Sequence, residues 1–312
     1  MQKNSLFDIL DLEAGFTDFG TAHNRVMVSF SGGKDSVATL MACLEQYPKH
    51  IVEAIFCDTG DEAPETYEYI QYFHENIHPV TRLATRLLDN DGGKTRKFES
   101  VKIPIDMPAE TVRRDYHTVY DEIIDYYHRI KSIHPKLKSN FSPYPSIHNR
   151  HCTRTLKTQT FGRYLTSIVS LENRSLTVHC LGIRRGESTN RSKQQMFAYN
   201  PDNGVDLWYP IANYTIHDVW AMHDKYGVKR NAVYENDKRS NCIGCVFAGV
   251  DSIRNAIDKH GSEIVDGWVR VEEETGYKMW GHIGINDIVD GSTYDFETNP
   301  LFSCASGFCD VA

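Results

Sequence analysis

Apolar positions recur along the chain in two patterns, short continuous runs and longer stretches with helical spacing. Residues 26–30 (VMVSF) form a short apolar run, and residues 37–47 then carry apolar side chains three and four positions apart. Residues 51–56 (IVEAIF) form a second short run. The order strand, helix, strand predicts a β-α-β unit, and parallel pairing in such a unit brings the loops that follow the strands to one edge of the sheet.

The same patterns continue beyond the middle of the chain. Residues 65–77 repeat apolar side chains at helical spacing, and residues 176–183 form another apolar run that predicts a buried strand. Thr215 with Asp218 three positions later is typical of a capping box, which predicts a helix that ends near Gly227. The sheet is therefore expected to draw strands from both halves of the chain.

Together these elements predict an α/β fold, with a mostly parallel, twisted sheet flanked by helices. We expect one domain over residues 1–235, with a basic helical insertion at about 110–170. Cysteine and glycine are frequent beyond residue 240, and helical spacing returns near 250–275. Residues 236–312 are therefore predicted to form a Cys-containing, mostly helical C-terminal region.

Charge is distributed unevenly along the chain. The 312 residues carry 34 lysines and arginines against 42 aspartates and glutamates, a net charge of −8. This balance argues against a protein that coats nucleic acid or an anionic membrane with its whole surface. Residues 126–171, however, contain eight lysines and arginines and no acidic residue. Such a segment is either a solvated basic face or the seat of a polyanion, and its lack of acids favours the polyanion.

The sequence also limits the compartment. No run approaches the roughly 20 apolar residues of a membrane-spanning helix, and the first residues lack the basic and apolar regions of a signal peptide. We therefore expect a cytoplasmic protein without a membrane partner. A core of this size needs no disulfides, so the eight cysteines are interpreted as thiols or metal ligands. Cys43, Cys57 and Cys180 fall in or next to predicted elements and are expected to pack in the core.

A glycine-rich loop lies between the first predicted strand and its helix, where backbone N–H groups and the helix dipole favour an anion. The glycines allow phosphate to approach the backbone, the lysine neutralises its charge, and the serines donate hydrogen bonds. The four residues that a Walker A motif needs between its glycines are absent, which disfavours γ-phosphate transfer. The predicted nucleotide-binding residues of the loop are Ser31, Gly32, Gly33, Lys34, Asp35 and Ser36.

The loop sequence SGGKDS after an apolar strand resembles the PP-loop of the ATP pyrophosphatase superfamily, whose members cleave ATP between the α and β phosphates. Residues 56–62 (FCDTGDE), 181–191 (LGIRRGESTNR) and 209–220 (YPIANYTIHDVW) resemble further blocks of the phosphoadenylyl-sulfate (PAPS) reductase family. That family includes the ATP sulfurylase small subunit and the DNA phosphorothioation sulfurtransferases. The resemblance covers about residues 24–260, and it implies an adenine nucleotide α-hydrolase-like (HUP) domain that binds ATP and Mg²⁺.

The resemblance also implies roles for single residues. The implied catalytic residues are Lys34, Asp35, Asp58 and Arg185. Asp58 ends a predicted strand, where it would hold Mg²⁺ or orient the nucleotide, and a strand-terminating aspartate without a chemical role is the alternative. Gly182, Arg184 and Arg185 follow a buried strand, where the arginines would bind phosphate or form a surface ion pair.

Three cysteines form the candidate metal site. Cys242 and Cys245 make a CxxC pair in a glycine-containing turn, and Cys152 lies in the basic segment. A CxxC pair is compatible with redox, zinc or iron–sulfur chemistry. The blocks RHCTRTLK and CIGCVFA resemble cluster-binding members of the family, which implies a [4Fe-4S] cluster, with zinc and free thiols as the alternatives.

The fourth ligand is less well defined. Family reductases that use adenylyl sulfate carry adjacent cysteines where this chain has His151 and Cys152. The doublet is therefore broken, and the missing ligand must come from elsewhere or from the histidine. The candidates are Cys309, which is favoured, Cys304 and His151.

Three functions remain open. The first is an ATP-dependent enzyme that adenylylates, and in one version thiolates, a polyanionic acceptor, with DNA as the precedent in the resembling group and a sulfur-donor protein as a partner. The second is a sulfonucleotide reductase, in which a tail thiolate attacks a sulfate sulfur. The third is a non-catalytic module that binds nucleic acid or regulates a partner. The intact loop and the broken cysteine doublet favour the first.

Overall fold

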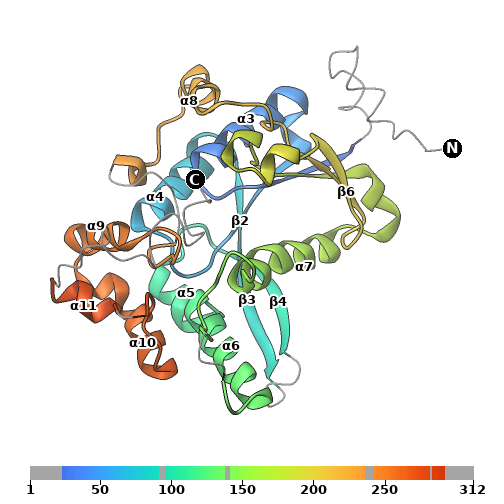
Figure 1. Cartoon of the computed structure of the whole chain (residues 1–312). Helices are drawn as coiled ribbons and strands as arrows, with labels where there is room; N and C mark the ends of the chain where they lie inside the picture. Colours follow the sequence, from blue (N-terminus) through green and yellow to red (C-terminus); the bar gives the residue numbers. More distant parts are fainter. Residues whose placement is uncertain (1–22, 91–95, 138–140, 236–241, 282, 292–312) are drawn as a thin grey trace. The chain divides into compact units, whose positions relative to one another are not determined.

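The computed structural model describes residues 23–90, 96–137, 141–235, 242–281 and 283–291 (Figure 1). Its strands form a seven-stranded sheet in the order β4-β3-β2-β1-β5-β7-β6. The strands of the described residues are β1 (Arg25–Ser29), β2 (Val52–Cys57), β3 (Val80–Asn90), β4 (Arg96–Ile103), β5 (Thr177–Cys180), β6 (Phe197–Asn200) and β7 (Val205–Trp208).

The central pairings are parallel, and the antiparallel pairings lie at the two edges. β1 pairs in parallel with β2 and β5, and β5 pairs in parallel with β7. β3 and β4 form an antiparallel hairpin, as do β6 and β7. The predicted α/β fold with a mostly parallel sheet is therefore confirmed, whereas the sequence patterns did not predict the two hairpins.

Helices follow the strands in the predicted places. The predicted helix over 37–47 is α3, which starts three residues earlier, and the predicted helix over 65–77 is α4. The described helices are α3 (Lys34–Gln46), α4 (Pro64–Asn76), α5 (Ala109–Asp115), α6 (Val119–Ile133), α7 (Gln159–Ile168), α8 (Ile216–Lys225), α9 (Val250–His260), α10 (Asp266–Thr275) and α11 (Ile285–Val289). None of the helices in these described ranges has the length and apolar character needed to cross a lipid bilayer.

The predicted start of α8 is confirmed in detail. The Thr215 side chain accepts a hydrogen bond from the Asp218 backbone N–H, and the Asp218 carboxylate accepts from the Thr215 N–H at 2.7 Å. Each group satisfies a polar atom that the first turn of a helix leaves without an intrahelical partner. A local sequence signal of this kind is sufficient to fix where a helix begins.

The chain divides into two compact units, each built from three segments. The first unit comprises Met1–Phe56, Tyr72–Thr81 and Leu165–Arg230. The second comprises Cys57–Gln71, Arg82–Tyr164 and Asn231–Ala312. The predicted boundary near residue 235 stays a prediction.

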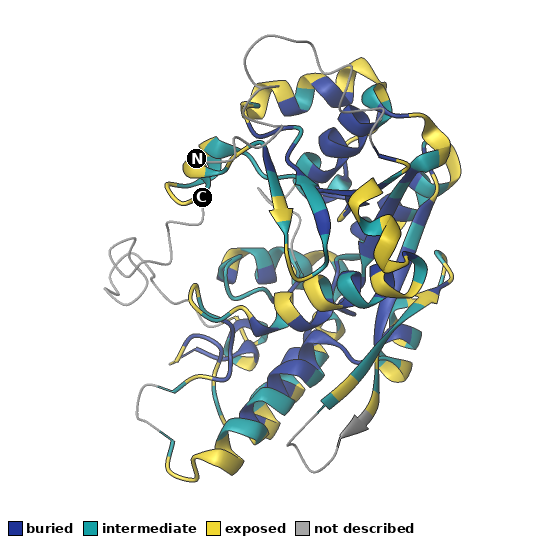
Figure 2. Cartoon of the chain, turned by 90° about the vertical axis from the view of Figure 1, so that its right-hand side faces the viewer, coloured by how far each residue is buried: buried dark blue, intermediate teal, exposed yellow. Residues whose placement is uncertain are grey.

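Each unit has its own apolar core. In the first, Val26, Met27 and Val28 of β1 are fully buried, and the rings of Phe30 and Phe73 lie 4.7 Å apart. In the second, the buried cluster includes residues of α6, α9, α10 and α11, with Trp268 as the largest fully buried side chain. Figure 2 shows helices whose buried residues lie on one side and whose exposed residues lie on the other, the arrangement that the helical spacing predicts.

Candidate functional site

The phosphate loop of the first unit joins β1 directly to α3. Gly32 has a φ of +70°, a conformation that residues with a Cβ rarely adopt, and Gly33 is the N-cap of α3. Because the N-cap is glycine, no side chain caps the first turn of the helix. The N–H groups of that turn therefore point toward the position where an anion would bind.

The two serines brace the loop from inside. Ser36 Oγ donates to the Gly33 carbonyl at 2.8 Å and accepts from the Ser31 backbone N–H at 3.1 Å. Ser31 Oγ in turn lies 3.3 Å from Ser36 Oγ. Both predicted loop serines thus hold the backbone of the loop in shape, which fixes the direction of its N–H groups.

Two cations lie beside one carboxylate at the start of α3. Asp35 is 3.2 Å from Lys34 Nζ through Oδ2, and it accepts a 2.6 Å hydrogen bond from Arg184 Nε through Oδ1. Gly182 lies close to the backbone of the first turn of α3, because a Cβ at that position would lie 3.1 Å from the Asp35 carbonyl carbon and oxygen. The structure therefore brings Lys34, Asp35, Gly182 and Arg184 together, and positive charge gathers at the loop.

Arg185 has a different set of contacts from its neighbour. Its Nε donates to the Gln194 carbonyl at 2.7 Å, and its Nη1 donates to Asn213 Oδ1. The bond to Gln194 lies within the segment between β5 and β6, and the bond to Asn213 ties that segment to the one after β7. The catalytic role implied for Arg185 stays a prediction, and of the two arginines it is Arg184 that contacts the loop residues.

A histidine on α8 also supports the loop, and the sequence reasoning missed it. His223 Nε2 donates to the Lys34 carbonyl at 2.9 Å, and the side chain is buried. Burial lowers the pKa of His223, which favours the neutral ring. The available signal was its position four residues after Val219, on the buried face of α8.

Asp58, the first residue after β2, belongs to the second unit, and both of its carboxylate oxygens accept hydrogen bonds there. Its Oδ2 accepts from Arg82 Nε at 2.9 Å and from Nη2 at 2.6 Å. Its Oδ1 accepts from the Gly60 N–H at 2.8 Å and from the Tyr67 hydroxyl at 2.9 Å. These donors fit an internal ion pair better than a magnesium ligand. Its predicted role toward the nucleotide stays a prediction.

The candidate metal ligands gather in the second unit. Cys242 forms an isolated β-bridge with Glu62 and lies 3.4 Å from Thr59 Oγ1, and the Cys245 N–H donates to the Cys242 carbonyl at 3.1 Å. Burial raises the pKa of both thiols, and the nearby Cys152 raises that of Cys245 further. The structure therefore brings the three predicted cysteines into one neighbourhood.

A lysine and a glutamate lie among these thiols. Lys157 lies on a π-helical turn that spans Thr153–Thr158, and its Nζ is 3.9 Å from Glu62 Oε1. Burial raises the pKa of Glu62 to about 7, and the Asp58 charge adds to the effect. Burial lowers the pKa of Lys157, but the negative charges of Cys242 and Glu62 outweigh this and raise it. An ammonium group in this position favours the thiolate form of the cysteines that bind soft metals.

Both ring nitrogens of His151, the histidine candidate for the fourth ligand, face groups other than the cysteines. Its Nε2 is 3.0 Å from the Pro143 carbonyl, and its Nδ1 is 3.4 Å from Glu122 Oε1. Glu122 is itself fully buried, between Arg96 and His117. Cys304 and Cys309, the other candidates, lie outside the described residues.

The donor chemistry fits a thiophilic group. Three partly buried sulfur donors are the ligand set of zinc or an iron–sulfur cluster rather than of Mg²⁺. Within the residues that the structure describes, no three such side chains are arranged closely enough to hold a metal ion. The [4Fe-4S] cluster and its zinc alternative therefore stay predictions, with Cys152, Cys242 and Cys245 as the residues that would hold either.

Several arginines of the basic segment over 126–171 contact aromatic or hydroxyl side chains. Arg150 stacks on Phe247 at 4.6 Å and Arg129 on Tyr126 at 5.3 Å, while Arg163 Nη2 donates to Thr160 Oγ1 at 3.1 Å. Such stacking leaves a guanidinium able to bind a phosphate through its N–H groups. The predicted polyanion at this segment stays a prediction.

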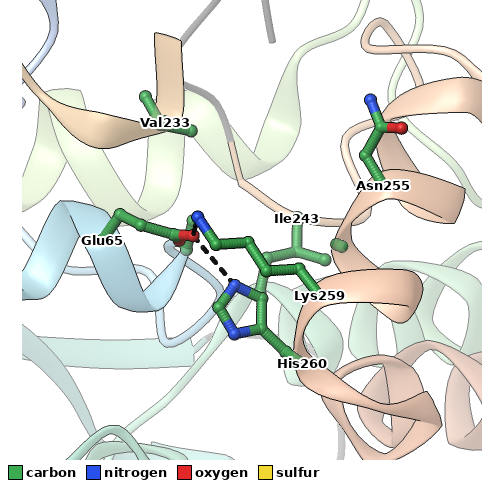
Figure 3. A pocket seen from close by; sticks show the side chains of 8 residues that line it. Glu65, Val233, Ile243, Asn255, Lys259 and His260 are labelled. Carbon is green, nitrogen blue, oxygen red and sulfur yellow. Dashed lines mark hydrogen bonds and ion pairs between the residues drawn. The ribbon is translucent and has the colours of Figure 1, made fainter. Parts of the chain in front are cut away.

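A small cavity of about 30 Å³ adjoins the CxxC turn in the second unit (Figure 3). Ile243, from the middle of the turn, lines it together with Glu65, Lys259 and His260. Glu65 Oε1 forms ion pairs with Lys259 Nζ and, at 3.0 Å, with His260 Nε2. The cavity has room for about one water molecule, so these charges join α4 to α9 rather than forming a ligand site.

Comparison with known proteins gives a consistent family signal. Residues 25–249 match the model of the phosphoadenosine phosphosulfate reductase domain. The chain is 28% identical over 261 residues to an uncharacterized 37.8 kDa protein of Escherichia phage 186, across 78% of this chain and 74% of that protein. It is 30% identical over 109 residues to the adenosine 5'-phosphosulfate reductase of Neisseria meningitidis, across 35% of this chain and 41% of the reductase.

Among solved structures, a crystal structure of PAPS reductase from Candida auris in a phosphate complex aligns with a TM-score of 0.43 at 12% identity. That alignment covers 75% of this chain and 92% of the reductase.

Proposed function

Since the chain belongs to the phosphoadenosine phosphosulfate reductase domain family, we propose that it is an ATP-binding PP-loop enzyme that cleaves ATP between the α and β phosphates. The product would be an adenylylated polyanionic acceptor, with DNA as the first candidate. In a second stage, sulfide released by a donor protein would attack the adenylylated acceptor phosphorus, and AMP would leave with the electron pair of the broken bond. The observation that carries the proposal is the braced loop of Ser31–Ser36, with Lys34 and Arg184 beside it.

The chemistry follows from the groups at the loop. An acceptor oxygen attacks the α-phosphorus, the bond from that phosphorus to the α-β bridging oxygen breaks, and pyrophosphate leaves with the electron pair. Charge develops on the departing pyrophosphate, and fixed donors such as the loop N–H groups and Lys34 stabilise such charge without reorganising. Asp35 keeps Lys34 and Arg184 in place through its ion pairs, and His223 holds the Lys34 backbone by a hydrogen bond to its carbonyl.

The acceptor and the cysteines have proposed roles as well. The acid-free segment over 126–171 supports a polyanion as acceptor, because acidic side chains would repel it. Cys152, Cys242 and Cys245 are proposed to hold a [4Fe-4S] cluster, which would supply a rigid link between its ligands or a site for sulfur. Zinc in the same place would supply the rigid link alone.

Pyrophosphate release tests the proposal. Purified protein with ATP, Mg²⁺ and DNA is expected to release pyrophosphate in proportion to adenylylated acceptor, and Lys34→Ala should reduce the rate by about 100-fold, the loss typical of removing one transition-state donor. Lys193→Ala changes a lysine of the same unit that lies outside the loop and serves as the matched control. Equal rates for the parent and Lys34→Ala would overturn the proposal.

A second candidate is a sulfonucleotide reductase, which the 30% identity to a curated adenosine 5'-phosphosulfate reductase favours. A thiolate would then attack the sulfate sulfur of a bound nucleotide, and the nucleotide would leave. Adenylyl sulfate with reduced thioredoxin is the substrate pair that tests it. Sulfite production without pyrophosphate release from ATP would replace the first proposal by this one.

A further inference from the structure

A buried aspartate lies beside the CxxC turn, and neither the sequence motifs nor the proposed chemistry assigns it a role. Asp61 is fully buried. Its Oδ1 accepts from the Tyr120 hydroxyl at 2.5 Å, and its Oδ2 accepts from Trp268 Nε1 at 3.0 Å and from the Gly244 N–H at 3.1 Å. Three donors from three separate parts of the second unit therefore converge on one carboxylate.

One of these donors lies inside the turn itself. Gly244 stands between Cys242 and Cys245, so Asp61 is bonded to the backbone that joins the two thiols. The main chain adds to this link, because the Ile243 N–H donates to the Asp61 carbonyl at 2.8 Å and Glu62 forms the β-bridge to Cys242. The Asp61 segment and the turn are therefore fixed against each other by both side-chain and backbone bonds.

Packing restricts the turn from the other side. A Cβ at Gly244 would lie 2.0 Å from Trp268 Nε1, so only glycine allows the turn to approach the indole closely. The indole N–H then meets the same Asp61 oxygen that binds Gly244. The carboxylate is thus shared between the turn and the residue that packs on it.

The carboxylate of Asp61 satisfies three donors at an electrostatic cost. Burial raises the pKa of Asp61 to about 7 in spite of its three donors, because the charged form is poorly solvated. An apolar residue would avoid this penalty but would leave the three donors without an acceptor. Groups that orient metal ligands are often retained for function, and their loss typically weakens metal binding by about 10- to 100-fold.

We propose that Asp61 is a positioning residue for the Cys242–Cys245 turn, and that it determines how tightly this turn and Cys152 bind a thiophilic metal. The inference rests on the cysteine part of the proposed function and is independent of the ATP loop. The carboxylate holds the Gly244 N–H, the N–H direction fixes the turn, and the turn fixes the two sulfur atoms before the metal arrives.

The test measures Co²⁺ binding by the reduced, metal-free full-length protein under anaerobic conditions. Sulfur ligation gives Co²⁺ a charge-transfer absorption band, which reports the site without any enzyme assay. Asp61→Asn keeps the size of the side chain but can no longer serve all three donors as an acceptor, and it should weaken Co²⁺ binding by about 10- to 100-fold. Tyr120→Phe removes one donor, leaves the Gly244 bond, and should give a smaller loss.

Glu272→Gln is the matched control. Glu272 is also a partly buried carboxylate of the second unit that accepts backbone N–H groups, from Met279 at 2.8 Å and Ile285 at 2.9 Å, but it does not contact the CxxC turn. Glu272→Gln should alter the free energy of unfolding while leaving Co²⁺ affinity and the absorption band unchanged.

Three results would overturn the inference. They are parental Co²⁺ affinity in Asp61→Asn, an equal loss of affinity in Glu272→Gln, and a parent protein that binds no Co²⁺ through sulfur. If Asp61→Asn fails to fold, Tyr120→Phe decides by the same comparison. Pyrophosphate release from ATP is measured separately, so failure of this inference and failure of the proposed function are distinguishable.

Discussion

The ion pair between Asp58 and Arg82 makes the sharpest prediction about stability. Both side chains are at most 2% exposed, and Arg82 also donates to the Ile105 carbonyl at 2.8 Å and the Met107 carbonyl at 2.7 Å. Arg82→Met would leave the Asp58 carboxylate buried with two neutral donors and no counter-charge. Breaking a buried pair in this way typically lowers the free energy of unfolding by about 3–5 kcal/mol.

That loss is a large fraction of the roughly 5–15 kcal/mol by which a typical domain is stable. Urea unfolding followed by tryptophan fluorescence and circular dichroism measures it, provided that the denaturant slope is unchanged. Asp58→Asn should also be destabilising, because it removes the charge that Arg82 faces. The double variant should lose less free energy of unfolding than the two single variants together, because it contains neither the Asp58 charge nor the Arg82 charge and so leaves no charge unpaired.

Arg86→Met is the matched control for this prediction. Arg86 lies on the same strand as Arg82, and its ion pair with Glu99 at 2.8 Å is exposed to solvent. Water screens such a pair, so little change in unfolding is expected. If Arg82→Met and Asp58→Asn unfold like the parent while Asp58→Asn loses pyrophosphate release, the carboxylate serves the nucleotide and our structural account of Asp58 is refuted.

Three further predictions concern the loop, the CxxC turn and acid stability. Ser36→Ala should weaken ATP binding about 5- to 10-fold in calorimetry, because it removes about 1 kcal/mol of hydrogen bonding that shapes the loop; unaltered affinity would contradict the bracing role. Gly244→Ala should lower the midpoint of urea unfolding strongly, because the added Cβ meets the Trp268 indole. Gly186→Ala, where the added Cβ has open space, should leave the midpoint unchanged. Equal midpoints for the two variants would contradict the packing of Gly244 against Trp268. Burial raises the pKa of Glu65, but the hydrogen bond from Lys259 and the charges of Lys259 and His260 lower it overall. The stabilisation by Glu65 is therefore present above the ordinary glutamate pKa of 4.5 and is lost as the pH falls below it. Thermal unfolding from pH 6 to pH 3 should show Glu65→Gln approaching the parent in stability, and a constant difference would count against the ion pair.

Local patterns predicted the elements that local physics determines. The Thr215 capping box and the strand, loop and helix around Lys34 depend on residues within a few positions of one another, and both were found where the sequence placed them. The β3–β4 hairpin was missed because β3 carries a buried arginine, Arg82, inside an otherwise mixed pattern. An arginine in such a place is unfavourable by itself and is explained only by its partner Asp58.

The candidate site shows the same limit. Cys242 and Cys245 were evident from their spacing, and the structure places Cys152 near Cys245. Asp61 was not evident, because its three donors come from residues that are distant from it in sequence. The role of a buried polar residue depends on which groups folding brings to it, and periodicity carries no information about that.

The identity of the products from labelled ATP tests the central claim most directly. Protein incubated with Mg²⁺, DNA and ATP labelled separately at the α and γ phosphates is expected to release the γ label as pyrophosphate and to retain the α label as AMP or acceptor-bound adenylate. Lys34→Ala should form both products about 100-fold more slowly. Release of the γ label as inorganic phosphate, with ADP as the other product and no pyrophosphate at any stage, would contradict the account.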